Sequence, residues 1–126
     1  MARIYLTVAE IYQMQHLLIE TFGGLHGVRD RNAVEAAVFR PQIGYYHTLE
    51  EEAAALMESL ANNHGFVDGN KRIAFVATAT FLELNGLALE VETEEGFEFI
   101  DGSLERGELR FGRIVEWVKE HTGTID

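Results

Sequence analysis

Residues 70–84 read NKRIAFVATATFLEL, and this stretch decides the fold. Apolar side chains occur on nearly every side of the helix that its composition predicts, whereas a surface helix keeps one polar face. A helix without a polar face belongs in the middle of a bundle, where other helices cover it. Asn85 and Gly86 then end the helix, because both residue types tolerate the left-handed backbone that closes helices.

The segments before this stretch predict two further helices with clear starts. Thr7 and Thr48 are each followed three residues later by Glu, which is the spacing of a capping box. The helices that they start are expected over 8–22 and 49–63. Apolar residues recur at helical spacing in both, and Gln15 is the one polar residue in the apolar stripe of the first.

A short helix and the C-terminal part complete the expected architecture. Asp30 caps a helix that runs through Val38, and Pro41 ends it because proline lacks the N–H of the next helical bond. After Gly86 we expect an extended piece over 87–91, a helix over 94–104 that Thr93 caps, and a last helix over 109–121. Five or six helices with little strand predict an all-α fold, a compact bundle in a single domain over residues 1–126.

Composition limits the classes of protein that this sequence can represent. Hydrophobic residues make up 47% of the chain, yet no apolar run reaches the roughly 20 residues of a membrane helix. The absence of cysteine excludes thiolate metal sites. The formal net charge of -11 argues against a general nucleic-acid binder, which needs a basic face. Without an apolar leader after Met1, we expect a cytoplasmic protein that binds neither membranes nor nucleic acids directly.

The segment from His64 to Arg72 reads HGFVDGNKR and gathers the residues that can carry chemistry. It enters the buried helix, where free N–H groups and the helix dipole attract anions, and Gly69 lets a phosphate approach the backbone. Arg72 can hold phosphate oxygens as a fork, and Lys71 adds a point charge. Asp68 alone would repel phosphate, so we expect it to bind Mg2+ that bridges the phosphates.

Three more residues of the segment receive expected roles. His64 is the expected general base, because histidine can accept a proton from a hydroxyl group near neutral pH. Asn70 joins the phosphate-binding groups, and Phe66 anchors the loop in the core. Each of these residues alone also has an ordinary explanation as turn, cap or solvated surface. Their coincidence at one helix entry favours a phosphoryl- or nucleotidyl-transfer site.

The segment resembles the signature of the Fic/Doc family, His-x-Phe-x-(Asp/Glu)-(Gly/Ala)-Asn-(Gly/Lys)-Arg. The similarity to the Doc branch extends over most of the chain, including residues 12–27, the helix before the segment and the Asn85-Gly86 end of the next one. The resemblance implies the Fic/Doc fold and an enzyme that uses ATP. The signature positions are matched by His64, Phe66, Asp68, Gly69, Asn70, Lys71 and Arg72.

Two departures separate the segment from the Fic proteins that transfer AMP. Lys71 replaces a Gly of their pattern, and Phe75 stands where they carry a second Arg. The Doc branch shows this variant. It implies that ATP binds in a flipped orientation and that the γ-phosphate goes to a threonine of elongation factor Tu, which arrests translation.

Three alternatives stay open beside this toxin kinase. They are AMP or other nucleotidyl transfer to a protein hydroxyl, a non-catalytic protein-binding module, and, with least support, a metal-dependent ribonuclease. The ribonuclease would need several converging carboxylates, and the segment offers only Asp68.

The sequence also bears on regulation. Many Fic enzymes carry an inhibitory segment, (Ser/Thr)-x-x-x-Glu-(Gly/Asn), but Val91 stands four residues before Glu95 and Gly96, so the pattern is absent. The Doc resemblance implies instead a separate antitoxin whose C-terminal segment lies against the toxin. Because this chain is acidic, we expect that segment to be partly basic.

Other polar and aromatic residues carry weaker expectations. The loop that holds Tyr45, Tyr46 and His47 can contact a target protein, or it can be ordinary loop packing. The remaining histidines show no spacing typical of metal ligands and receive no role; they are His16, His26 and His121.

Overall fold

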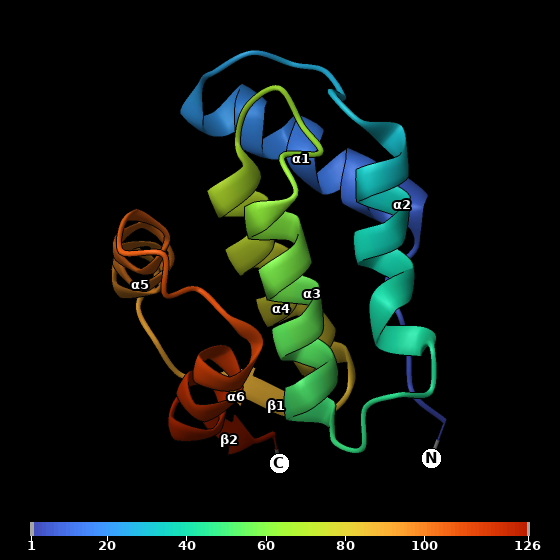
Figure 1. The fold of residues 1–126 in the computed structure, drawn as a ribbon, viewed down its shortest axis with the longest axis vertical. Helices are drawn as coiled ribbons and strands as arrows, with labels where there is room; N and C mark the ends of the chain where they lie inside the picture. The colour runs from blue at the N-terminus through green and yellow to red at the C-terminus, as the bar shows by residue number, and fades with distance from the viewer. Residues whose placement is uncertain (1, 126) are drawn as a thin grey trace.

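The computed structural model describes residues 2–125, and helices dominate it (Figure 1). The mostly helical, compact fold confirms the all-α prediction. Within residues 2–125, no helix combines the length and apolarity that crossing a bilayer requires. In chain order the elements are α1 (Val8–Phe22), α2 (Arg31–Phe39), the 3-10 turn η1 (Arg40–Gln42), α3 (Leu49–Asn62), α4 (Asn70–Leu84), β1 (Leu87–Leu89), α5 (Thr93–Glu105), α6 (Phe111–Glu120) and β2 (Thr122–Thr124).

Helices α3 and α4 lie side by side at the centre, and the other helices surround them (Figure 1). Helix α4 buries large side chains such as Ile73 and Phe81, as its sequence predicts. Helix α3 is as deeply buried, although its pattern indicates only an apolar stripe. Its three consecutive alanines, residues 53–55, are all fully buried, and such small side chains let neighbouring helices approach closely.

Local capping bonds set the helix starts where the sequence places them. Thr7 and Thr48 each accept a bond from the backbone N–H of the Glu three residues later, whose carboxylate bonds back. Asp30 caps α2 through the same kind of acceptor bond. The backbone N–H of His47 also donates to the Glu51 carboxylate at 2.9 Å, and this bond lowers the pKa of Glu51 below its ordinary value.

Two helix starts in the C-terminal half differ from the sequence prediction. Thr93 is the first residue of α5 and not its cap; Glu92 takes that position. The last helix begins at Phe111 and not at Leu109, which is buried in the core. Glu58 of α3 explains this later start, because its Oε2 accepts the Phe111 backbone N–H at 2.7 Å and acts as a cap supplied by another helix.

A two-stranded sheet joins the extended piece expected after α4 to the C-terminal end of the described chain. β1 pairs antiparallel with β2, with Leu87 opposite Thr124 and Leu89 opposite Thr122. The sequence predicts the first strand but not the second. The pairing depends on a partner far away in the sequence, which local patterns do not reveal.

Helix α5 packs against α4 through Gly96. This glycine is buried, and a Cβ atom added to it would overlap the ring of Phe75 from α4. The missing side chain therefore lets α5 approach the first half of α4 closely.

Replacing Gly96 with Ala should lower the free energy of unfolding by about 1–2 kcal/mol, because overpacking against Phe75 outweighs the better helix propensity of Ala. The matched control is Gly112→Ala in α6, where no atom lies within 4 Å of an added Cβ, so this variant should gain up to about 1 kcal/mol. Urea unfolding of both variants measures the difference. Equal stability changes in the two variants would contradict the close packing of α5 on α4.

Candidate functional site

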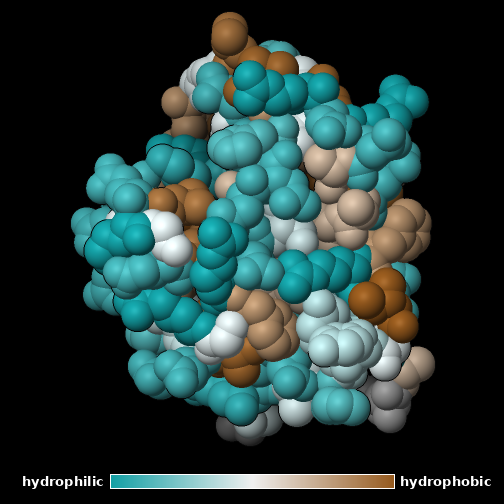
Figure 2. Space-filling view, in the orientation of Figure 1, coloured by the Kyte–Doolittle hydropathy of each residue, from teal (hydrophilic) through white to brown (hydrophobic). Residues whose placement is uncertain are grey.

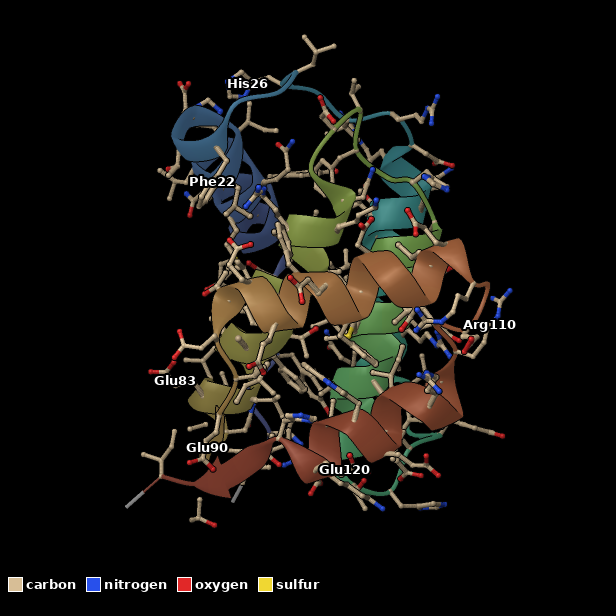
Figure 3. The ribbon with its side chains drawn as sticks, turned by 90° about the vertical axis from the view of Figure 1, so that its left-hand side faces the viewer. Phe22, His26, Glu83, Glu90, Arg110 and Glu120 are labelled. Atoms are coloured by element: carbon tan, nitrogen blue, oxygen red, sulfur yellow. The ribbon has the colours of Figure 1, made fainter. Side chains whose placement is uncertain are left out.

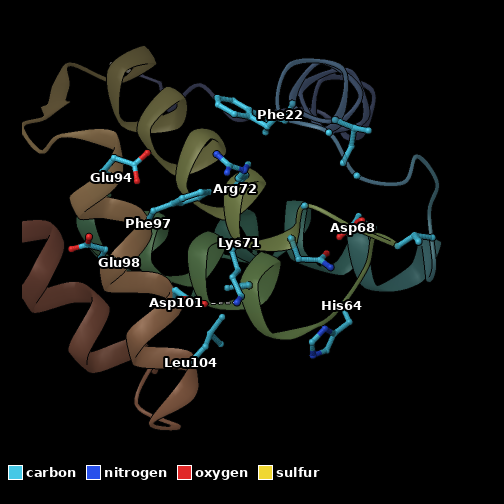
Figure 4. Close-up of a pocket in the computed structure, with 18 residues that line it drawn as sticks. Phe22, His64, Asp68, Lys71, Arg72, Glu94, Phe97, Glu98, Asp101 and Leu104 are labelled. Atoms are coloured by element: carbon cyan, nitrogen blue, oxygen red, sulfur yellow. Dashed lines mark hydrogen bonds and ion pairs between the residues drawn. The ribbon is translucent and has the colours of Figure 1, made fainter.

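An open pocket of about 740 Å³ lies at the N-terminal end of α4 (Figure 4). The loop 64–69 and the start of α4 form one side, the end of α1 forms a second, and α5 forms the opposite wall. This volume falls within the range of roughly 300–1,000 Å³ that small-molecule pockets occupy. All of the expected site residues except Phe66 line the pocket: His64, Asp68, Gly69, Asn70, Lys71 and Arg72.

The backbone of the loop leaves the start of α4 open to the pocket. Gly69 is the N-cap of α4 and has a φ of 77°, in the left-handed region that glycine adopts without strain. Within the described chain, no side chain caps the first N–H groups of α4, so this helix end can accept an anion. His64, exposed at the pocket rim, has a φ of 51°, a conformation that concentrates at functional sites when it occurs outside glycine.

Phe66 and Asn70 hold the loop against the body of the protein. Phe66 is 1% exposed, and its ring meets the Tyr12 ring edge-on. The Asn70 side chain accepts a bond from the Phe66 N–H and donates one to the Phe66 carbonyl, both at 3.0 Å. Both polar atoms of the Asn70 amide therefore position the loop in this structure, and its contact with phosphate stays a prediction.

Asp68 is held at two points by residues close to or within α1. Gln15 Nε2 donates to the Asp68 carbonyl at 3.2 Å, and the Leu25 backbone N–H donates to Asp68 Oδ2 at 3.0 Å. Gln15 is the one polar residue in the apolar stripe of α1, and it is buried. Its hydrogen bond therefore positions the backbone of Asp68. The sequence contains that signal, but sequence reasoning gave the residue no role.

The two cations of the segment have different surroundings. Lys71 Nζ forms an ion pair with Asp101 of α5, and both side chains are about half exposed. The Arg72 guanidinium carbon lies 4.1 Å from the centre of the Phe22 ring and 4.3 Å from that of Phe97 (Figure 4). Cation–π contacts with both rings hold Arg72 in place beside the start of α4.

Helix α5 supplies a pocket wall that sequence reasoning missed. Glu94, Phe97, Glu98 and Asp101 recur at helical spacing and so share one face, the face that lines the pocket. The sequence contains this helical spacing. No local sequence pattern, however, indicates that this face of α5 packs near the segment 64–72. Among residues 2–125, none of these carboxylates belongs to a group of three close enough to hold one metal ion.

Other expected positions lie outside the pocket. Tyr46 accepts a hydrogen bond from Arg40 Nε at 2.7 Å and Tyr45 is 73% exposed, but neither lines the pocket, and neither does His47. Phe75, which stands where other Fic proteins have a second arginine, is buried between α4 and α5. That position therefore offers no charge to a bound anion.

The donor set of the pocket fits a nucleotide phosphate with Mg2+. Asp68 provides the carboxylate oxygen that Mg2+ prefers, and phosphate oxygens and water can complete its coordination. The uncapped start of α4 with Lys71 and Arg72 provides the positive groups for phosphate. His64 lies at the rim of the pocket and is exposed to solvent.

Comparisons with known proteins show the family of this chain. The sequence model of the Fic/DOC family matches residues 5–82. The chain is 49% identical over 76 residues to a protein named Toxin Doc from Mycolicibacterium smegmatis, a match that spans 56% of this chain and 58% of that protein. It is 30% identical over 126 residues to Protein kinase doc from Escherichia phage P1, a match that spans 97% of this chain and 98% of the other. With its segment 64–72 at the entry of a buried central helix, the chain therefore belongs to the Fic/Doc family.

Proposed function

We propose that this chain is a Doc-type toxin that transfers the γ-phosphate of ATP to a protein hydroxyl in the cytoplasm. A threonine of elongation factor Tu is the proposed target, with arrest of translation as the result. We also propose that residues 1–126 act as one domain, since helices from α1 to α6 contribute to a single core.

The proposal depends mainly on one observation. A possible base, a possible Mg2+ ligand and two cations meet in one pocket at the uncapped start of α4. Phosphoryl transfer needs positioning, charge neutralisation and proton removal, and this set of groups can supply all three. The similarity to a protein named as a kinase over 97% of this chain adds support.

The residues divide the chemistry as follows. His64 takes the proton from the target hydroxyl while its oxygen attacks the γ-phosphorus. The bond from that phosphorus to the bridging oxygen breaks, and ADP leaves with the electron pair. Arg72, Lys71 and the N–H groups at Gly69 and Asn70 hold phosphate oxygens. Mg2+ at Asp68 would supply further neutralisation of phosphate charge.

An antitoxin is the second proposed partner, because one relative is named Toxin Doc. The surface of this chain is mainly hydrophilic with separate apolar patches (Figure 2), and acidic residues outnumber basic ones by 21 to 10. A partly basic C-terminal segment of a partner fits such a surface. Phe22 and Leu25, which are 55% and 66% exposed at the end of α1, provide apolar contacts near the pocket.

Replacing His64 with Ala should lower label transfer from γ-labelled ATP to elongation factor Tu by about 100-fold or more, because no base remains for the hydroxyl. Urea unfolding should be unchanged, since the side chain is exposed. His121→Ala, which removes an imidazole just after α6 that does not line the pocket, is the control.

The same assay with α-labelled ATP separates the alternatives. Transfer of α-label would show nucleotidyl transfer and contradict the kinase proposal. No transfer of either label, with toxicity retained in His64→Ala, would favour a non-catalytic binding module. Full γ-transfer by His64→Ala would contradict the role of this residue as the base.

Replacing Asp101 with Asn should lower the KM for ATP by up to about fivefold, because Lys71 would no longer have to leave a carboxylate before it reaches a phosphate. Glu98→Gln removes the same charge from the same wall without breaking the ion pair, so it controls for the general field. Steady-state kinetics of both variants gives the comparison. If the KM rises in Asp101→Asn, the ion pair positions Lys71 productively and does not compete with ATP.

The antitoxin proposal predicts that expression of this chain alone arrests growth and that expression of His64→Ala does not. Growth curves after induction measure the effect. High-yield expression of the unchanged chain without a growth defect would remove the need for an inhibitory partner.

A further inference from the structure

Three side chains with metal-ligating atoms gather at the end of α1, outside the pocket. His16 and Glu20 are one helical turn apart, and His26 lies close to both of them. Figure 3 shows His26 on the loop that follows α1. His16 Nε2 lies 3.7 Å from Glu20 Oε1, and His26 Nε2 lies 3.5 Å from Glu20 Oε2. One ligand atom of each residue lies within 4.8 Å of the other two. The spacing of the two histidines in the sequence does not reveal this cluster, because the fold of the loop after α1 brings them together.

The loop reaches this position through bonds that do not involve the cluster. Gly23, Gly24 and Gly27 have φ values of 87°, 115° and 130°, which turn the chain back beside α1. The Leu25 N–H donates to Asp68 Oδ2 at 3.0 Å, and the Gly27 carbonyl accepts the Val67 N–H at 3.1 Å. His26 lies between these two anchored residues, so the fold brings the three ligands together before any ion arrives.

We propose that His16, Glu20 and His26 bind a divalent transition metal ion, and that zinc suits the site best. Two imidazoles and one carboxylate are a common ligand set for zinc, with an open fourth position for water. The two imidazoles approach different oxygens of Glu20, at 3.7 and 3.5 Å, and one ligand atom of each residue lies within 4.8 Å of the other two. Side-chain rotations alone would bring these atoms to the roughly 3.4 Å that separates neighbouring ligand atoms in a tetrahedral zinc site. Mg2+ prefers oxygen ligands only, so this site differs in ion preference from that proposed at Asp68.

The surroundings favour binding from solvent. All three side chains are exposed, so an ion reaches them without a conformational change. The net charge of -11 raises the local concentration of cations. The two imidazole rings stack with centroids 4.5 Å apart, and they must turn out of this stack for their in-plane lone pairs to converge on a shared ion.

A bound ion would restrain the loop that helps to hold Asp68 at the pocket. It would link α1 to the loop that donates the Leu25 N–H to Asp68. The ion would bind the folded chain and not the unfolded one, so it should raise the unfolding temperature.

The test is a calorimetric titration of the full chain with Zn2+ in a buffer without chelators. We expect one zinc ion per chain, and at least about tenfold weaker binding in His16→Ala and His26→Ala. His47→Ala should bind as the unchanged chain does, because it removes an exposed imidazole elsewhere. Co2+ in place of Zn2+ should give an absorption spectrum of low coordination number that the two site variants lack.

Three outcomes of the titration would overturn the proposal. They are no binding by the unchanged chain, equal affinity in both site variants, and loss of binding in His64→Ala while His16→Ala retains it. The last would place the ion in the motif pocket. A separate measurement of the unfolding temperature would also overturn the proposal if zinc raised it equally in His26→Ala and in the unchanged chain. These readouts measure binding, so they are independent of the proposed phosphoryl transfer.

Discussion

The candidate site depends on the pair of hydrogen bonds between the Asn70 side chain and the backbone of Phe66. An amide is one of the few side chains that can both accept from an N–H and donate to a carbonyl, and here it serves one residue with both functions. Phe66 is fixed a second time by its buried ring. Asp68 lies in the short loop between Phe66 and Asn70, and His64 lies between the end of α3 and Phe66. Both exposed side chains are therefore attached next to anchored backbone.

The fold was largely predictable because its signals are local. Thr7, Asp30 and Thr48 start their helices where the sequence places them, since a cap needs only residues a few positions away. Apart from the shift of one residue at Thr93, the errors occur where a residue distant in the sequence decides the structure. Glu58 of α3 caps α6 from another helix, and residues 122–124 become a strand only because β1 lies beside them.

The candidate site was predictable in its sequence motif but not in its surroundings. The segment 64–72 carries the motif in one continuous run, so residue types and spacing were enough to find it. The end of α1 and the wall of α5 reach the same pocket only through tertiary packing. That packing depends on contacts such as the one between Gly96 and Phe75, which no local pattern contains.

The two aromatic rings beside Arg72 determine what an arriving anion encounters. A free arginine side chain has about 2 kcal/mol of rotamer entropy to lose when it binds a ligand. Phe22 and Phe97 already restrict the guanidinium plane, so much of this ordering occurs when the protein folds. Lys71, one residue earlier, is half exposed and is held by an ion pair with Asp101. The two neighbouring cations thus differ in kind: Arg72 is a rigid template that fixes the orientation of an anion, and Lys71 is a point charge that must exchange a carboxylate for the anion.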